Sequence, residues 1–210
     1  MRSILIPITA VLVSAFLTQS CIAQPQVATA TWLDETRPQS WNEPGQQIPA
    51  APRIEAALDP RCRESARAPQ LDEDRQIRDR GWDLVGPFQG GWDVLIIQGT
   101  ASYDGMCRPL QYQSFVFVRG AFAGTLSPKP MDSRSDGALG RTTLQSQTQL
   151  TAEYSRYEES DALCCPSRRT VVTFEISTDP AIVRPFSTSS SPTTQDSSNA
   201  SSMLAIVPAW

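Results

Sequence analysis

The segment YQSFVFVRGAFAGTL, residues 112–126, decides the fold that the sequence predicts. Strand-favouring residues run up to Arg119 and Gly120 and continue after them, and glycine tolerates the positive φ that a tight turn needs. The segment therefore predicts two strands joined by a hairpin. In residues 115–118 the phenylalanines face one side and the valines the other. Because both faces are apolar, we expect this strand to be central and buried on both sides.

Three further segments have strand lengths and strand-favouring residues: WDVLIIQG (92–99), TQLTAEYSRYEE (148–159) and RTVVTFEIS (169–177). The last two alternate apolar and polar residues. They are therefore polar on one face, which is typical of an antiparallel sheet with one face in water. Residues 53–80 are densely charged and favour short helices. We therefore expect an α+β fold over residues 53–179, in which a small antiparallel sheet of four to five strands packs against one or two short helices.

The flanking segments predict export and flexibility. Residues 1–23 have the charged start, apolar run and small residues of a secretory signal peptide, and their apolar run is shorter than the roughly twenty residues of a membrane span. The sequence LTQSC also resembles a lipoprotein signal, so Cys21 is a candidate lipidation site. Residues 24–52 are rich in Pro and Gln and predict a flexible linker. Residues 180–210 are rich in Ser and Thr and predict a disordered tail.

Export to the periplasm or cell surface bears on the cysteines, because oxidation is permitted there. Cleavage or acylation removes Cys21 from the thiol count and leaves Cys62, Cys107, Cys164 and Cys165. A bond between the two adjacent cysteines would close an eight-membered ring. We therefore expect each of them to pair with Cys62 or Cys107, stapling the helical segment to the end of a hairpin, and the sequence leaves the choice between the two pairings open.

Composition excludes several chemistries. The chain has no histidine, which removes the commonest general base and metal ligand, and the cysteine spacing lacks the short steps of zinc sites. We expect no metal and no cofactor. A net charge of −4 without a basic stripe argues against a nucleic-acid partner and leaves a lipid at Cys21 as the sole expected membrane contact. Trp82 and Trp92, in the repeated motif GWDLV and GWDVL, are candidate binding residues. The sequence favours core or lid roles for them, with Trp92 as a core aromatic and Trp82 covering an edge or lining a groove.

The C-terminal half resembles a known family. QSFVFVRGAFAGTLSPKP, with the hairpin residues Gly120, Gly124 and Thr125, and DALCCPS, residues 161–167, are similar to motifs of the LppP/LprE lipoprotein family. The resemblance extends over about residues 80–177. It implies an exported, often lipid-anchored protein of the bacterial envelope without an established catalytic activity.

These observations favour a non-catalytic envelope or periplasmic module that binds an unknown envelope component or small ligand. One alternative is a thiol–disulfide protein that uses Cys164 and Cys165. Another is a secreted carbohydrate-active domain that uses Trp82, Trp92 and scattered carboxylates, although the sequence does not bring two carboxylates to the separation that glycoside hydrolysis requires.

Overall fold

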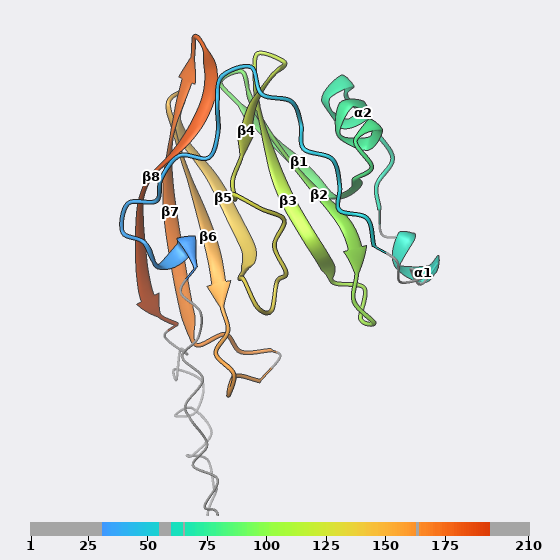
Figure 1. Cartoon of the computed structure of the whole chain (residues 1–210), viewed down its shortest axis with the longest axis vertical. Helices are drawn as coiled ribbons and strands as arrows, with labels where there is room; N and C mark the ends of the chain where they lie inside the picture. Colours follow the sequence, from blue (N-terminus) through green and yellow to red (C-terminus); the bar gives the residue numbers. More distant parts are fainter. Residues whose placement is uncertain (1–30, 55–59, 65, 163, 194–210) are drawn as a thin grey trace, which may run out of the picture.

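A computed structural model describes residues 31–54, 60–64, 66–162 and 164–193, and it shows two antiparallel four-stranded sheets packed together (Figure 1). The first sheet has the order β1-β2-β3-β4 and the second the order β5-β6-β7-β8. The strands are β1 (Asp83–Gly91), β2 (Val94–Tyr103), β3 (Pro109–Val118), β4 (Ala121–Thr125), β5 (Ala138–Ser146), β6 (Gln149–Arg156), β7 (Arg168–Thr178) and β8 (Ala181–Pro192).

The predicted α+β class with one small sheet is therefore wrong, because the chain is mostly β and doubles the expected number of sheets. Three strands were not expected. β1 carries an irregular register between Val85 and Gln89, and β5 has no fully buried position, so neither shows a clean period of two. β8 pairs with β7 as far as Pro192, although its second half is mostly serine and threonine. The disordered tail predicted from residue 180 is thus wrong for residues 181–192, and residues 194–210 lie outside the described part.

The hairpin expected in residues 112–126 is confirmed, with β3 and β4 meeting at Arg119 and Gly120, both at positive φ. β3 separates two hydrophobic cores. Val116 and Val118 point between the sheets, into a core that β2, β6, β7 and β8 complete. Phe115 and Phe117 point to the outer face of the first sheet, into a second core. Both faces of this strand are buried, as its sequence predicts.

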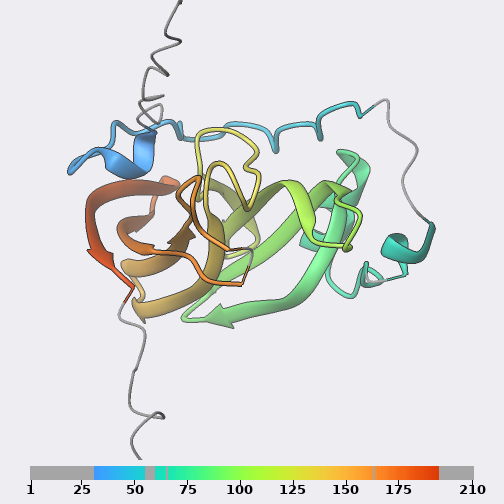
Figure 2. The ribbon, with the colours of Figure 1, turned by 90° about the horizontal axis from the view of Figure 1, so that it is seen from below.

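Residues 31–54 form an N-terminal strap that crosses from the second sheet to the outer face of the first (Figures 1 and 2). The strap begins with the 3-10 helix η1 (Trp32–Asp34), whose Leu33 is fully buried in the inter-sheet core. Further along, Ile48 enters the second core, and the Pro49 carbonyl accepts a hydrogen bond of 2.8 Å from the indole of Trp82. The prediction of a flexible linker over residues 24–52 is therefore wrong for residues 31–52, and residues 24–30 lie outside the described part.

Asn42 fixes the strap where β4 of one sheet meets β8 of the other. Its side chain is 2% exposed, and its amide nitrogen donates to the carbonyls of Thr125 (3.0 Å) and Val183 (2.8 Å). Its amide oxygen accepts the Thr125 N–H at 3.0 Å. Gly124, at φ +133°, makes room for this contact, since a Cβ built there would lie 2.3 Å from the Asn42 Cγ. One strap side chain thus bridges both sheets.

Two short helices precede the sheets. α1 (Pro60–Arg63) carries Cys62, and α2 (Asp72–Asp79) packs on the second core through the fully buried Ile77. The buried carboxylate of Asp74 accepts hydrogen bonds from both terminal nitrogens of Arg67, at 2.6 and 2.5 Å. It also accepts one from the N–H of Leu71, just before the helix. Burial alone would raise the pKa of Asp74, but these hydrogen bonds outweigh it and lower that pKa.

Candidate functional site

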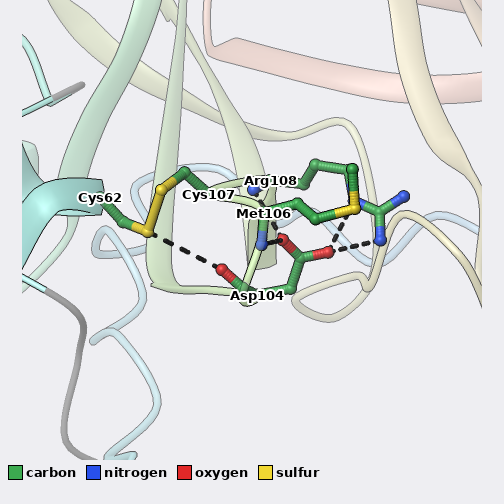
Figure 3. The surroundings of a disulfide bond; sticks show 5 residues. All are labelled: Cys62, Asp104, Met106, Cys107 and Arg108. Carbon is green, nitrogen blue, oxygen red and sulfur yellow. Dashed lines mark hydrogen bonds and ion pairs between the residues drawn. A yellow bond between two sulfur atoms is a disulfide. The ribbon is translucent and has the colours of Figure 1, made fainter.

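The first disulfide joins α1 to the β2–β3 loop, through Cys62 and Cys107 (Figure 3). Cys62 is 1% exposed and packs with Val85 in a small cluster of its own. The Asp104 carboxylate organises the loop beside it, accepting hydrogen bonds from the backbone and guanidinium of Arg108 at 2.9 and 2.6 Å. This bond cross-links segments 45 residues apart, which is a structural role.

The second disulfide joins the adjacent residues Cys164 and Cys165, so the predicted pairing of each with Cys62 or Cys107 is wrong. The reason is the unforeseen second sheet. Cys107 follows a strand of the first sheet and faces α1, whereas the vicinal pair lies in the β6–β7 loop of the other sheet. The position of the vicinal pair between two antiparallel neighbours agrees with the sequence prediction. Both residues of the pair are exposed.

The β6–β7 loop is held in shape by polar contacts that do not involve sulfur. The Asp161 carboxylate accepts the N–H groups of Glu158 (2.8 Å) and Ser167 (2.9 Å) across the loop. Arg134, from the segment between β4 and β5, donates to the Asp161 carbonyl at 2.5 Å and lies 4.6 Å from the ring centre of Tyr157. The hydrogen bonds to its carboxylate lower the pKa of Asp161, so this carboxylate stays ionised in mild acid. We call the hydrogen bonds from Glu158 and Ser167 to this carboxylate the Asp161 clasp.

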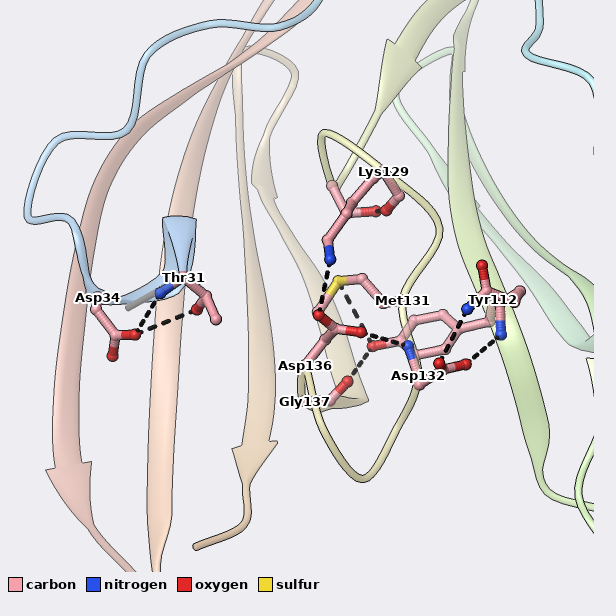
Figure 4. Close-up of polar contacts among 10 residues, drawn as sticks. Thr31, Asp34, Tyr112, Lys129, Met131, Asp132, Asp136 and Gly137 are labelled. Carbon is pink, nitrogen blue, oxygen red and sulfur yellow. Dashed lines mark hydrogen bonds and ion pairs between the residues drawn. The ribbon is translucent and has the colours of Figure 1, made fainter. Parts of the chain in front are cut away.

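The β4–β5 segment that supplies Arg134 is itself anchored to β3 (Figure 4). Asp132 accepts the backbone and side-chain amides of Gln111 at 2.8 and 2.9 Å, and its own N–H donates to Asp136 at 2.9 Å. The buried Tyr112 hydroxyl donates to the Gly137 carbonyl at 2.5 Å. Burial raises the pKa of Tyr112 above its ordinary value, so this hydroxyl remains a donor.

The strap reaches the same end of the sandwich through Asp34 (Figure 4). Its carboxylate caps η1 by accepting the Thr31 N–H at 2.9 Å, and it also binds Arg156 at 3.2 Å and Arg168 at 2.8 Å, where β6 ends and β7 begins. Burial would raise the pKa of Asp34, but these hydrogen bonds and charges hold it well below its usual range. The first described residue, Thr31, therefore lies beside the β6–β7 loop. We call this end, with the β6–β7 loop and residues 131–137, the loop end.

The two candidate tryptophans do not form a shared binding surface. Trp82 is fully buried in the second core, edge-on to Phe115 at 5.2 Å between ring centres, so its proposed binding role is wrong. Trp92 is 56% exposed at the tip of the β1–β2 hairpin, where it and Asp93 adopt positive φ. The sequence favours Trp92 as the core aromatic and Trp82 at an edge or groove, whereas the structure places Trp82 in a core and Trp92 in a turn.

A narrow cleft lies where β1 faces β5, at the open side of the sandwich. The buried hydroxyl of Ser114 lines it and has no hydrogen-bond partner among the described residues, and Thr142 donates to Gln89 across the mouth. The cleft encloses about 50 Å³, which suits one or two water molecules rather than a metabolite.

Four of the scattered carboxylates each form an ion pair with a basic neighbour. The pairs are Asp93 with Arg119, Asp104 with Arg108, Asp136 with Lys129, and Glu153 with Arg169. Within the described part of the chain, no three His, Cys, Asp or Glu side chains gather as metal ligands would. No helix that the structure describes is long and apolar enough to cross a membrane. Cys21 lies outside the described residues.

A comparison with known protein families gives a match over part of the chain. Residues 92–179 match the family model LppP/LprE lipoprotein. The resemblance inferred from the sequence is therefore confirmed over this part of the chain, which is less than half of its length. Neither the curated proteins nor the solved structures contain a match to the chain.

Some of the features described above lie within the residues that match the LppP/LprE model, and others lie outside them. It contains the whole vicinal pair Cys164–Cys165 together with its Asp161 clasp, and it contains Gly124. The strap and its Asn42 lie outside it, as does Cys62. Sequence reasoning missed Asn42 and Arg134, because their partners lie far away in the chain and no local pattern indicates them. It also missed Ser114, which lines the inter-sheet cleft.

Proposed function

We propose that this protein is an exported, lipid-anchored module of the cell envelope that acts by binding an envelope component, with Cys21 as the acylated residue. The match to a lipoprotein family and the LTQSC sequence support the anchor. The inter-sheet cleft of about 50 Å³ falls below the 300–1,000 Å³ of ordinary small-molecule sites, and a larger hollow of about 380 Å³ near the β5–β6 tip, lined by Ser146, Gln149 and Glu175, is open to solvent. An outer surface is therefore the better candidate for recognition than an internal pocket, which favours a macromolecular partner.

The observation that carries this proposal is the packing of the strap. Asp34 holds Thr31 at the loop end, so nine residues, 22–30, separate Cys21 from the first described residue. The ten Cα–Cα steps from Cys21 to Thr31 span at most about 35 Å. An anchored protein would therefore keep its loop end near the membrane and the opposite β5–β6 tip away from it.

The anchor is tested by the intact mass of the mature protein extracted from membranes, with and without reduction. We expect a chain that begins at Cys21 and carries acyl groups, and a soluble product from the Cys21→Ser variant. A mature wild-type chain that begins after residue 21 and carries no lipid would overturn the proposal.

The orientation is tested by energy transfer to an acceptor dye in the bilayer. Lys129 is the only lysine, so Lys129→Arg combined with either Ser160→Lys or Gln147→Lys gives a unique side-chain label at the loop end or at the opposite β5–β6 tip. The eight residues of β6 separate these ends by about 26 Å. We expect stronger transfer from the Ser160 position. Equal or reversed transfer contradicts the orientation, and a label on the α-amine would be common to both variants.

A further inference from the structure

The vicinal disulfide is the one crosslink in the described fold that cannot act as a staple. A disulfide stabilises a protein by closing a long loop of the unfolded chain, and Cys62–Cys107 does so across 45 residues. Cys164 and Cys165 are one residue apart, so their bond joins no second element to the β6–β7 loop. The structural role expected from the sequence does not apply to this pair.

The two disulfides also differ in their exposure to solvent. Cys164 and Cys165 are both exposed, whereas Cys62, within α1, is 1% exposed and its partner Cys107 is half-buried. Exchange requires that an attacking thiolate approach one of the sulfurs, and exposed disulfides are the labile class. A soluble dithiol therefore has access to both residues of the vicinal pair, whereas in Cys62–Cys107 one residue is buried and the other only partly exposed.

The loop can also tolerate opening of the bond. Asp161 ties Glu158 to Ser167, Arg134 holds the Asp161 carbonyl from another segment, and the Cys165 N–H donates to Ala162 at 3.0 Å. None of these bonds uses sulfur. Reduction of the pair would leave the loop in place, which is the requirement for a reversible site rather than a point of unfolding.

We propose that Cys164–Cys165 is a thiol–disulfide exchange site that accepts electrons from an exported dithiol protein, a role that goes beyond the binding function proposed above. The partner's thiolate attacks one sulfur, the bond between the two cysteines breaks, and the other cysteine leaves as a thiolate that takes up a proton. The partner's second thiol then attacks the mixed disulfide. The partner becomes a disulfide, and its two electrons and two protons reside on Cys164 and Cys165.

The test uses the mature, oxidised chain and dithiothreitol as the dithiol. Free thiols are alkylated at each dithiol concentration, and the tryptic peptide of residues 157–168, which carries both cysteines, is weighed. We expect this peptide to take two alkyl groups at a dithiol concentration at least about tenfold below that which opens Cys62–Cys107. The melting temperature should change by less than about 2 °C, and oxidised glutathione should close the bond again.

The Cys165→Ser variant provides the second measurement. With oxidised glutathione its lone Cys164 should retain one glutathione adduct, whereas the wild type should resolve the adduct to the internal bond. The proposal is overturned if the pair stays closed until Cys62–Cys107 opens, if it remains dithiol under oxidant, or if it is bonded to Cys62 or Cys107. It is also overturned if reduction unfolds the domain. None of these results bears on the lipid anchor, whose test is the mass of the amino-terminal residue.

Discussion

Replacing Asn42 by alanine should destabilise the whole sandwich, although the sequence around Asn42 resembles a linker. The change removes the acceptor of the Thr125 N–H and the donor to the Val183 carbonyl, both at a buried site. The Thr125 carbonyl keeps a partner, because the Trp41 indole donates to it at 3.0 Å. Two backbone groups are thus stranded, at about 1–3 kcal/mol each. We expect the free energy of unfolding to fall by about 2–6 kcal/mol.

Gly124 offers an independent way to break the same contact. Alanine at this position would place its Cβ 2.3 Å from the Asn42 Cγ, so Asn42 must leave, and φ +133° adds about 1–3 kcal/mol of backbone strain. In the Asn42→Ala background the clash disappears and the strain alone remains. The double variant should therefore lose about 2–6 kcal/mol less than the sum of the two single losses, because the loss of the Asn42 contacts is counted in both single variants.

Urea unfolding of the oxidised protein, followed by tryptophan fluorescence and circular dichroism, measures these differences. Gln47→Ala is the matched control, because Gln47 is an exposed amide in the same strap, and its replacement should change stability by less than about 0.5 kcal/mol. If Asn42→Ala behaves like this control, or if the Asn42 and Gly124 effects simply add, the strap does not bridge the sheets as described.

Three further predictions rest on the same structure. Cys62→Ser should cost about 4 kcal/mol through the loop it opens, whereas Cys164→Ser should cost less than about 0.5 kcal/mol, as urea midpoints of both variants would show. Trp82→Ala should lower the free energy of unfolding by about 3–5 kcal/mol, and Trp92→Ala should lower it by less than about 0.5 kcal/mol. The Trp92 variant alone should lose acrylamide-accessible fluorescence without unfolding. Equal losses of stability would contradict the burial of Trp82 and the exposure of Trp92. Because the folded-state pKa of Asp34 lies below its unfolded value of about 4, its stabilisation is complete above that pH and disappears as the pH falls further. Asp34→Asn should therefore be less stable at pH 7 and lose less of its remaining stability between pH 5 and pH 2, and parallel pH profiles would refute this assignment.

The parts of the fold that the sequence predicts are those whose information is local. Alternation around a glycine turn predicts β3 and β4, and the separation of polar and apolar faces predicts β6 and β7. β8 escapes detection because its polar half is exposed at an edge, where hydrogen bonds to β7 require no apolar period. Composition of this kind is shared by edge strands and by disordered tails, so pairing decides between them.

The candidate site was predictable in its residues but not in its connectivity. DALCCPS gives the turn, yet the partner of each cysteine depends on which loops share an end of the sandwich. That arrangement follows from contacts between segments far apart in the chain, such as Asn42 with Val183 over 141 residues. A one-sheet fold would have brought all four cysteines together, whereas two sheets separate them. The error in the disulfides is therefore a consequence of the error in the fold class.

The strap also changes what an anchor at Cys21 could do. A flexible chain from Cys21 to residue 53 would let the domain tumble with a typical separation of about 30 Å and a reach of about 110 Å. Packing of residues 31–54 reduces the reach to about 35 Å and fixes which end of the sandwich the tether leaves. Cys164 and Cys165 lie at that same end. A dithiol partner would then have to act in the narrow space between the loop end and the bilayer, so membrane-bound or small reductants should outcompete bulky soluble ones at this site.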